Sequence, residues 1–137
     1  MDGLKELVQE LEKSGVAEAT SHKKHFRPWG WFESLEQHGN YHVKRLHVYP
    51  NSRLSFQSHK HRSEHWVVVQ GEAKVTLGED EFTLQENMST YINPNQKHRL
   101  ANETNELLTV IEVQTGSYFG EDDIERFDDD YDRIRSS

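Results

Sequence analysis

The sequence predicts an all-β domain, a barrel of short strands preceded by a short N-terminal helix. Apolar residues are concentrated in short runs such as Val67–Val69 and residues 107–111, which are typical of buried strands. Turn signals rich in Gly, Asn and Pro divide the middle of the chain at close spacing, and many short strands with close turns indicate a sandwich or barrel. At 137 residues the chain can bury one core and is too short for two.

The expected strands follow one another from Trp29 onward. They are residues 29–35, 41–49, 53–59, 64–70, 72–78, 80–84, 89–92, 98–102 and 106–114. Between residues 73–77 and 82–84, Gly78 and the acidic residues after it predict a tight hairpin.

The two ends of the chain differ from the middle. Leu4, Leu7, Val8 and Leu11 recur at helical spacing after a possible N-cap at Asp2, which predicts a short amphipathic helix. We therefore expect a helix and linker over residues 1–25, a barrel over residues 26–118 and a solvated acidic tail over residues 119–137.

Composition excludes several classes of function. The formal net charge of -8 argues against a nucleic-acid footprint, which needs a basic face. Without cysteine there can be neither a disulfide nor a thiolate metal site. No run approaches the roughly 20 apolar residues of a membrane span, and no secretory segment is visible. We expect a cytoplasmic protein without nucleic-acid or membrane partners.

Side chains of the kinds that bind metal ions are concentrated just before Val67–Val69. In one strand Gln57, His59 and His61 would share a face, Glu64 follows after a short turn, and His98 comes from a later segment. Imidazoles with a carboxylate suit a borderline divalent ion. The ion expected here is zinc, with manganese, iron, cobalt or nickel as alternatives. Whether Gln57 or His61 is the fourth ligand remains open.

The spacing of these residues resembles the two motifs of the cupin superfamily, double-stranded β-helices or jelly-roll barrels that hold a metal. Counting back from Gly71 places Glu64, His59 and Gln57 on the first motif's Glu and its two His positions, and His98 and Asn102 match the second motif's His-x-x-x-Asn. Gln57 departs from the family's His. Asn95 stands where the family has a glycine, and because Asn tolerates a left-handed backbone the turn should survive.

A narrower resemblance covers residues 27–133. The stretches Arg27-Pro-Trp-Gly-Trp-Phe, His61-Arg-Ser-Glu-His-Trp and Ile111-Glu-Val-Gln-Thr-Gly-Ser-Tyr are similar to the C-terminal domain of type II mannose-6-phosphate isomerases. In most of that family the domain follows a nucleotidyltransferase that makes GDP-mannose. A chain of this length has no room for it and no Gly-rich phosphate loop, so we expect no guanylyltransferase activity. A separate guanylyltransferase partner is left open.

The resemblance implies a metal-dependent isomerase that interconverts mannose 6-phosphate and fructose 6-phosphate, with a sugar phosphate as its small-molecule partner. The metal would be held by Gln57, His59, Glu64 and His98. A base must move a proton between C1 and C2, and the candidates are His61, Lys44 and Glu112. The phosphate ligands would come from Arg27, Arg53, Lys97 and Arg99. Arg99 would alternate away from His98, which weakens its claim to the pocket.

Two alternative functions are open. A non-catalytic module that binds sugar phosphate or nucleotide sugar would have the same fold, because fold does not determine function. A metal-dependent cupin oxygenase would use a similar ligand set with iron. We also expect a homodimer, because the edge strands and exposed aromatics of a small barrel are commonly covered by a second subunit.

Overall fold

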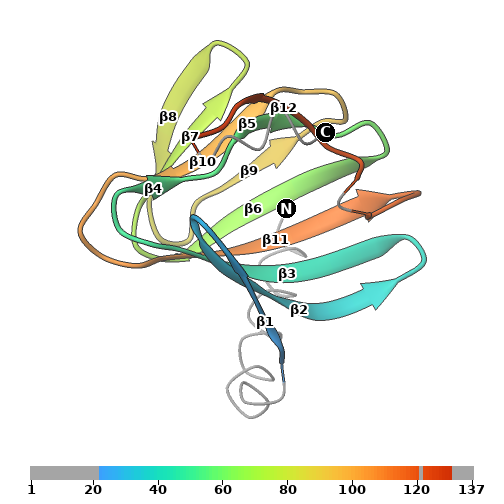
Figure 1. The fold of residues 1–137 in the computed structure, drawn as a ribbon, viewed down its shortest axis with the longest axis horizontal. Coiled ribbons are helices and arrows are strands. Elements are labelled where there is room, and N and C mark those ends of the chain that lie inside the picture. The colour runs from blue at the N-terminus through green and yellow to red at the C-terminus, as the bar shows by residue number, and fades with distance from the viewer. Residues whose placement is uncertain (1–21, 121, 131–137) are drawn as a thin grey trace.

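The computed structural model describes residues 22–120 and 122–130, and this part of the chain consists of strands and connecting loops (Figure 1). The strands are β1 (Lys24–Arg27), β2 (Gly30–His38), β3 (Tyr41–Val48), β4 (Ser52–Arg53), β5 (Phe56–Ser58), β6 (Arg62–Gln70), β7 (Ala73–Leu77), β8 (Asp80–Leu84), β9 (Ser89–Ile92), β10 (His98–Asn102), β11 (Leu108–Gly116) and β12 (Glu125–Asp128). Within these residues no helix is long and apolar enough to cross a membrane.

Two antiparallel sheets make up the barrel. The first has the order β1-β2-β3-β11-β6-β9, and the second has the order β12-β5-β10-β7-β8, with β4 also paired to β10. Strand β11 lies between β3 and β6, so a late segment of the chain joins two early ones (Figure 1). Strands β5 and β10 belong to the second sheet and β6 to the first, so the segments around residues 57–64 and 98 meet in the interior between the two sheets.

Alternation along the strands separates the core from the outer face of the first sheet. Leu108 and Val110 belong to the main apolar core between the sheets, together with Trp66 and Leu100. The side chains that alternate with these core residues point to the other face of the sheet. They form a second cluster of Val43, Val67, Ile111 and Val113. Each strand of the first sheet therefore has one face that can supply side chains to the interior.

The expected all-β fold is confirmed, and the strands of the middle lie close to their predicted ranges. The hairpin at Gly78 is present, with Leu77 opposite Asp80 and Gly78 at a φ of 60°. Asn95 has a φ of 65°, the left-handed conformation expected at the position that corresponds to the glycine of the second cupin motif. The turn before His98 thus keeps its shape without glycine.

Two strands fall outside the predicted set. Strand β1 begins at the end of the expected linker and continues into the expected barrel ahead of the first predicted strand, and it pairs with β2. Strand β12 lies in the segment expected to be a solvated tail, yet it pairs with β5 at the edge of the second sheet (Figure 1). Both segments have few apolar residues and no clear alternation, so they form strands because they pair with a neighbouring strand. The predicted N-terminal helix at residues 2–15 lies outside the described residues.

Candidate metal centre and pocket

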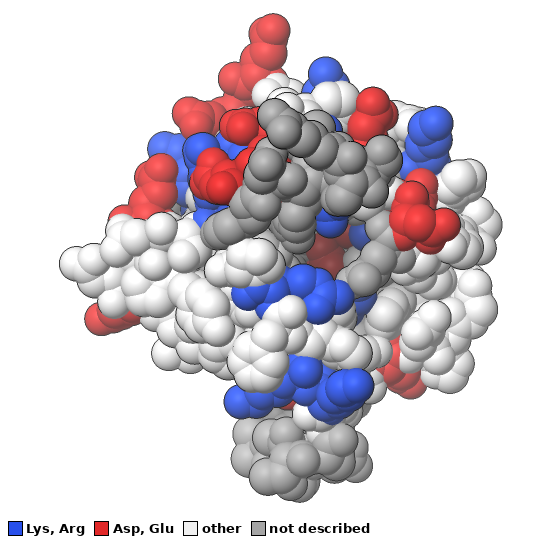
Figure 2. Space-filling model, viewed as in Figure 1, with Lys and Arg blue, Asp and Glu red and all other residues white. Residues whose placement is uncertain are grey.

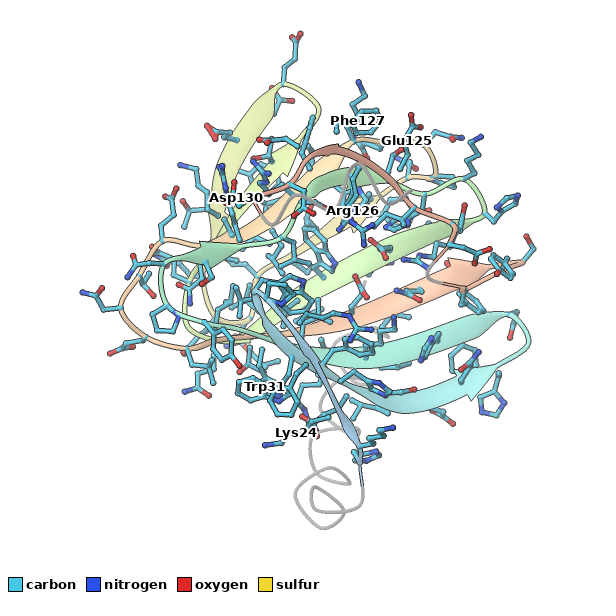
Figure 3. The ribbon with its side chains drawn as sticks, viewed as in Figure 1. Lys24, Trp31, Glu125, Arg126, Phe127 and Asp130 are labelled. Atoms are coloured by element: carbon cyan, nitrogen blue, oxygen red, sulfur yellow. The ribbon has the colours of Figure 1, made fainter. Side chains whose placement is uncertain are left out.

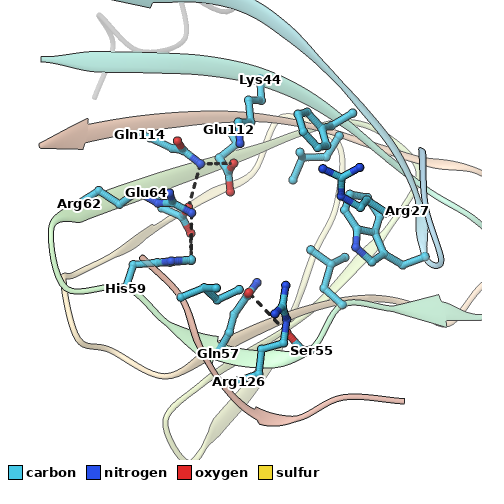
Figure 4. A pocket seen from close by; sticks show the side chains of 15 residues that line it. Arg27, Lys44, Ser55, Gln57, His59, Arg62, Glu64, Glu112, Gln114 and Arg126 are labelled. Carbon is cyan, nitrogen blue, oxygen red and sulfur yellow. Dashed lines mark hydrogen bonds and ion pairs between the residues drawn. The ribbon is translucent and has the colours of Figure 1, made fainter. Parts of the chain in front are cut away.

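A pocket between the two sheets collects most of the predicted site residues (Figure 4). It is lined by side chains from β1, β2, β3, β5, β6, β11 and β12 and the loops beside them. The polar and charged residues among them are Arg27, Lys44, Ser55, Gln57, His59, Arg62, Glu64, Glu112, Gln114 and Arg126. In Figure 2 basic side chains lie beside a hollow near the middle of the face shown, and acidic atoms lie within it.

Three side chains at one end of this pocket form a group that could hold a metal ion. The ligand atoms of His59, Glu64 and His98 all lie within 4.8 Å of one another. Glu64 Oε1 is 3.1 Å from His98 Nε2 and 3.8 Å from His59 Nε2. All three residues are buried. Glu64 comes from β6 and His98 from β10, so the group exists only because the two sheets face each other.

Both imidazole rings are held with Nε2 toward the group. Nδ1 of His59 is 2.6 Å from the carbonyl oxygen of Asp123, and Nδ1 of His98 is 2.8 Å from the carbonyl oxygen of Gln96. A carbonyl only accepts, so each Nδ1 must carry a proton, and Nε2 is the nitrogen that offers a lone pair once the ring is neutral, the form that a metal binds. Metal-binding histidines are oriented in this way by acceptors on their other nitrogen. The donor set therefore fits a divalent cation.

The charges of the group are strongly coupled. Burial alone would raise the pKa of Glu64, but the hydrogen bond from His98 and the nearby charges of His59, His98 and Arg62 hold that pKa well below its usual range. Burial lowers the pKa of His59 to about 4, although the charge of Glu64 opposes it. The pKa of His98 is raised, because the hydrogen bond and charge of Glu64 outweigh burial. Glu64 is thus a carboxylate, the form that a metal requires.

Backbone pairing between β5 and β10 places Gln57 beside this group. It is opposite His98 in the β5–β10 pairing, it lines the pocket, and its side-chain oxygen is 3.4 Å from the hydroxyl of Ser55, which donates to it. An amide oxygen in this place is a possible fourth ligand.

A second carboxylate lies in the same pocket. Glu112 is buried, and Nε1 of Trp66 donates to it at 2.8 Å. Nε2 of Gln114 donates to Glu112 at 2.8 Å and to Glu64 at 3.2 Å, so one amide links the two acids. Burial, followed by the negative charge of Glu64, raises the pKa of Glu112 to about 7. A carboxyl with such a pKa can both accept and release a proton near neutral pH.

Four cationic side chains line the pocket. Arg62 contacts the metal group directly, with Nε 3.3 Å from Glu64 Oε2 and Nη2 donating to His59 Nε2 at 3.3 Å. Lys44 and Arg27 lie over the ring of Phe32, at 4.5 Å and 5.1 Å. Arg126 on β12 lies on the inner side of that strand, whereas Glu125 and Phe127 lie on its outer side (Figure 3). An anionic ligand would be attracted to this pocket.

The structure separates four predicted site residues from the pocket. His61 follows the end of β5, so strand alternation does not apply to it; its side chain is 56% exposed and its Nδ1 is 3.0 Å from Asp123. Arg53 pairs with Asp130 at the surface, at 2.7 Å. Lys97 lies over the ring of Phe127, and Arg99 donates to the carbonyl of Leu54. The expectation that His61 shares a face with Gln57 and His59 is therefore wrong.

Several pocket residues were missed by the sequence interpretation. Arg62 precedes Glu64 by two residues and Gln114 follows Glu112 by two, so alternation along β6 and β11 could have placed both in the pocket. Arg126 had no such signal, because its strand was not expected. Asn102, from the second motif, is buried and donates to the carbonyls of Val48 and Glu106, so it holds a loop and is not among the residues that line this pocket.

Comparison with known proteins agrees with this fold. A family model described as mannose-6-phosphate isomerase C-terminal matches residues 14–129. The xanthan biosynthesis protein XanB of Xanthomonas campestris pv. campestris is 50% identical over 130 residues, 95% of this chain and 28% of that protein. The mannose-1-phosphate guanylyltransferase of Escherichia coli K12 is 44% identical over 131 residues, 96% of this chain and 27% of that protein. The chain thus spans less than a third of the length of these relatives.

Solved structures with low sequence identity share the cupin fold. A double-stranded β-helix protein from Klebsiella pneumoniae has a TM-score of 0.66 and 18% identity, covering 78% of this chain and 91% of that one. Oxalate decarboxylase from Bacillus subtilis has a TM-score of 0.68 and 16% identity, covering 79% of this chain and 30% of that one. The expected cupin architecture is confirmed.

Proposed function

Because the chain belongs to the family of mannose-6-phosphate isomerase C-terminal domains, we propose that it is a metal-dependent isomerase that interconverts mannose 6-phosphate and fructose 6-phosphate. The observation that supports this most strongly is one pocket that combines a buried His-Glu-His group with a second acid, Glu112, whose pKa is raised to about 7. Aldose–ketose isomerisation needs both features, a way to stabilise negative charge on oxygen and a group that moves a proton between C1 and C2.

The metal ligands in this proposal are Gln57, His59, Glu64 and His98. Neutral imidazoles, one carboxylate and an amide suit zinc, and also manganese, iron, cobalt or nickel. A divalent cation bound there would act as a Lewis acid toward the carbonyl and hydroxyl oxygens of the sugar.

We assign proton transfer to Glu112. Its carboxylate would take the proton from C2 of mannose 6-phosphate, as the electrons of the broken C–H bond form the C1–C2 double bond of the enediolate. It would then return the proton to C1, while the proton of the O2 hydroxyl passes to O1 and C2 becomes the ketone. Trp66 and Gln114 fix the orientation of the carboxylate through hydrogen bonds, and its pKa is near the pH at which the enzyme would work. Lys44 lines the same pocket and lowers the pKa of Glu112, so its ammonium would stabilise the charged form.

The phosphate ligands in this proposal are Arg27 and Arg126. Figure 4 shows Arg27 across the pocket from Glu64 and Arg126 on the wall beside Ser55. The two guanidinium groups would bind the phosphate while C1 and C2 lie near the acids. A guanidinium can donate two parallel hydrogen bonds to phosphate oxygens. Of the cations proposed from sequence, Arg27 stays in the set, and Arg126 takes the place of Arg53, Lys97 and Arg99.

The test is an isomerase assay on the zinc-loaded protein. Mannose 6-phosphate should be converted to fructose 6-phosphate, and a chelator should remove the activity. If the fully metallated protein binds the sugar phosphate by calorimetry yet exchanges no solvent deuterium into C2, the isomerase proposal fails and a binding function replaces it.

A pair of variants tests the phosphate ligands. Arg126→Ala should raise KM by roughly ten- to a hundredfold, since hydrogen bonds to charged groups contribute about 1.5–3 kcal/mol. Arg53→Ala is the matched control, because Arg53 pairs with Asp130 at the surface and should leave KM unchanged. Equal KM values for the two variants would remove Arg126 from the site.

A further inference from the structure

The segment that follows β11 contacts the ligand-bearing loop at successive residues. Arg126 on β12 is opposite Gln57 on β5. The carbonyl oxygens of Phe119 and Gly120 accept hydrogen bonds from Arg62, at 3.3 and 3.5 Å. Ser117 donates its backbone N–H to the carbonyl of His61. The C-terminal segment is therefore tied to the loop from one side of His59 to the other.

Asp123 makes the central contacts between the two segments. It is buried, with 8% of its surface exposed. Its two carboxylate oxygens accept the backbone N–H of Lys60 at 3.1 Å and of His61 at 2.9 Å, and one of them also contacts His61 Nδ1 at 3.0 Å. Its carbonyl oxygen accepts Nδ1–H of His59 at 2.6 Å. One residue thus fixes the backbone after His59 and the ring of His59 itself.

We infer that Asp123 is a positioning residue for the metal ligand His59, and that it makes metal binding depend on docking of the C-terminal segment. The carboxylate fastens residue 123 to the loop, and this fastening keeps the carbonyl oxygen within hydrogen-bond distance of His59 Nδ1. Nε2 then faces Glu64 and His98. The inference rests on the proposed metal site.

The physical reason is that, among the described residues, the carbonyl oxygen of Asp123 is the hydrogen-bond partner of His59 Nδ1. His59 follows the end of β5, so strand pairing does not fix its backbone. The described contacts of its ring nitrogens are Asp123 at Nδ1, and Arg62 and Glu64 at Nε2. If the acceptor at Nδ1 is lost, the ring can rotate or change tautomer. Loss of such partners of metal-binding histidines typically weakens metal affinity by about 10- to 100-fold.

The experiment compares zinc affinity in Asp123→Ala and Asp122→Ala, measured by competition with a chromophoric chelator. Asp122 is the matched control, because it is the adjacent acid and its carboxylate contacts the Tyr118 hydroxyl. We expect Asp123→Ala to bind zinc about 10- to 100-fold more weakly and Asp122→Ala to bind it as the wild type does. Equal zinc affinity in the two variants would overturn the inference.

A second measurement distinguishes positioning from a general loss of stability. In long-range ¹H–¹⁵N spectra of the zinc-loaded wild type, His59 should carry its proton on Nδ1. Asp123→Ala should lose this proton signal to solvent exchange while His98, held by Gln96, keeps its own. A variant that only loses stability would keep both signals.

The conservative variant Asp123→Asn keeps one acceptor oxygen, so its zinc affinity should lie between those of the wild type and Asp123→Ala. If Asp123→Ala does not fold, as judged by circular dichroism, Asp123→Asn decides the matter, and wild-type affinity in that variant would refute the role. Failure of the wild type itself to bind zinc would instead refute the proposed metal site.

Discussion

At the scale of single residues, burial of neighbouring ionisable groups makes their protonation states depend on one another. Glu64 stays charged because His98 and Arg62 lie beside it, and that same charge raises the pKa of Glu112. A side chain that is removed from this group therefore changes the charge of its neighbours as well as its own contacts.

Removing either histidine should abolish metal binding. His59→Ala or His98→Ala deletes a nitrogen that no neighbouring side chain can replace, so elemental analysis after dialysis should find no stoichiometric metal, while circular dichroism keeps its strand signal. His61→Ala is the control, because His61 is directed toward Asp123 and solvent. Metal loss in His61→Ala together with metal retention in Gln57→Ala would show that the proposed ligand set is wrong.

Glu112→Gln should lower kcat by at least about 100-fold, the size of a typical contribution from a positioned acid or base. In the wild type, kcat/KM should fall as pH decreases through the pKa of Glu112, because only the carboxylate can take the proton from C2. That pKa is about 7 without a cation, and a bound divalent ion should move the acid limb of the pH profile below this value. A variant with wild-type kcat would exclude Glu112 as the base.

The same pKa predicts how stability depends on pH in the metal-free protein. The pKa of Glu112 in the folded chain, about 7, lies above its ordinary value of 4.5. Between these two values the folded state holds a proton that the unfolded chain has lost, so the contribution of Glu112 to stability is lost as pH rises from about 4.5 to about 7. Denaturant unfolding should therefore show a shallower decrease of stability across this window in Glu112→Gln than in the wild type.

At the scale of strands, β1 and β12 complete the pocket from opposite sides. Each is a strand of four residues at the edge of a sheet, and each brings one arginine to the pocket, Arg27 and Arg126. The phosphate end of the pocket is therefore built by elements with few apolar contacts of their own. Their place is decided by pairing with β2 and β5.

The β1–β2 turn supplies a stability prediction at this scale. Gly30 lies opposite Arg27, and a Cβ added to it would be 1.8 Å from the carbonyl oxygen of His47. Gly30→Ala should push the backbone of β2 away from β3 and lower the free energy of unfolding by about 1–3 kcal/mol. Calorimetry should then find a lower Tm than in the wild type. Gly39→Ala is the control, since no atom lies within 4 Å of its added Cβ. Equal Tm values would contradict the close approach.

At the scale of the whole molecule, the distribution of charge matters more than its total. The chain has a net charge of -8, yet the pocket has four basic side chains, Arg27, Lys44, Arg62 and Arg126, against the two acids Glu64 and Glu112. Low-dielectric walls concentrate the field of such a pocket, so an acidic protein can attract an anionic sugar phosphate.

The oligomeric state is a prediction for the whole molecule. Phe26 and Tyr49 are exposed and lie near Trp31 on the first sheet, and β1 and β9 are the edge strands of this sheet in the part of the chain that the structure describes. Such surfaces are commonly covered by a second subunit, so we expect a homodimer. Light scattering at micromolar concentration should give twice the chain mass of 16.1 kDa, and a value equal to one chain would refute the dimer.

The sequence by itself determined the strands of the middle, the left-handed turn at Asn95 and the spacing that brings His59, Glu64 and His98 together. The strands, the turn and the spacing within each motif depend on a signal of a few residues, such as alternation or a turn residue, whereas the approach of His98 to Glu64 depends on the packing of the two sheets. Signals of this range are physically local, because side-chain direction in a strand and backbone strain in a turn are decided by neighbouring residues.

Only the tertiary structure decided which further residues face the site. His61 was expected in the pocket, but β5 ends at Ser58 and the carboxylate of Asp123 holds His61 outside it. Arg126 enters the pocket because β12 pairs with β5, a contact between segments distant in sequence. Such pairings depend on the free energy of the whole fold, and no local pattern in the acidic C-terminal segment indicates them.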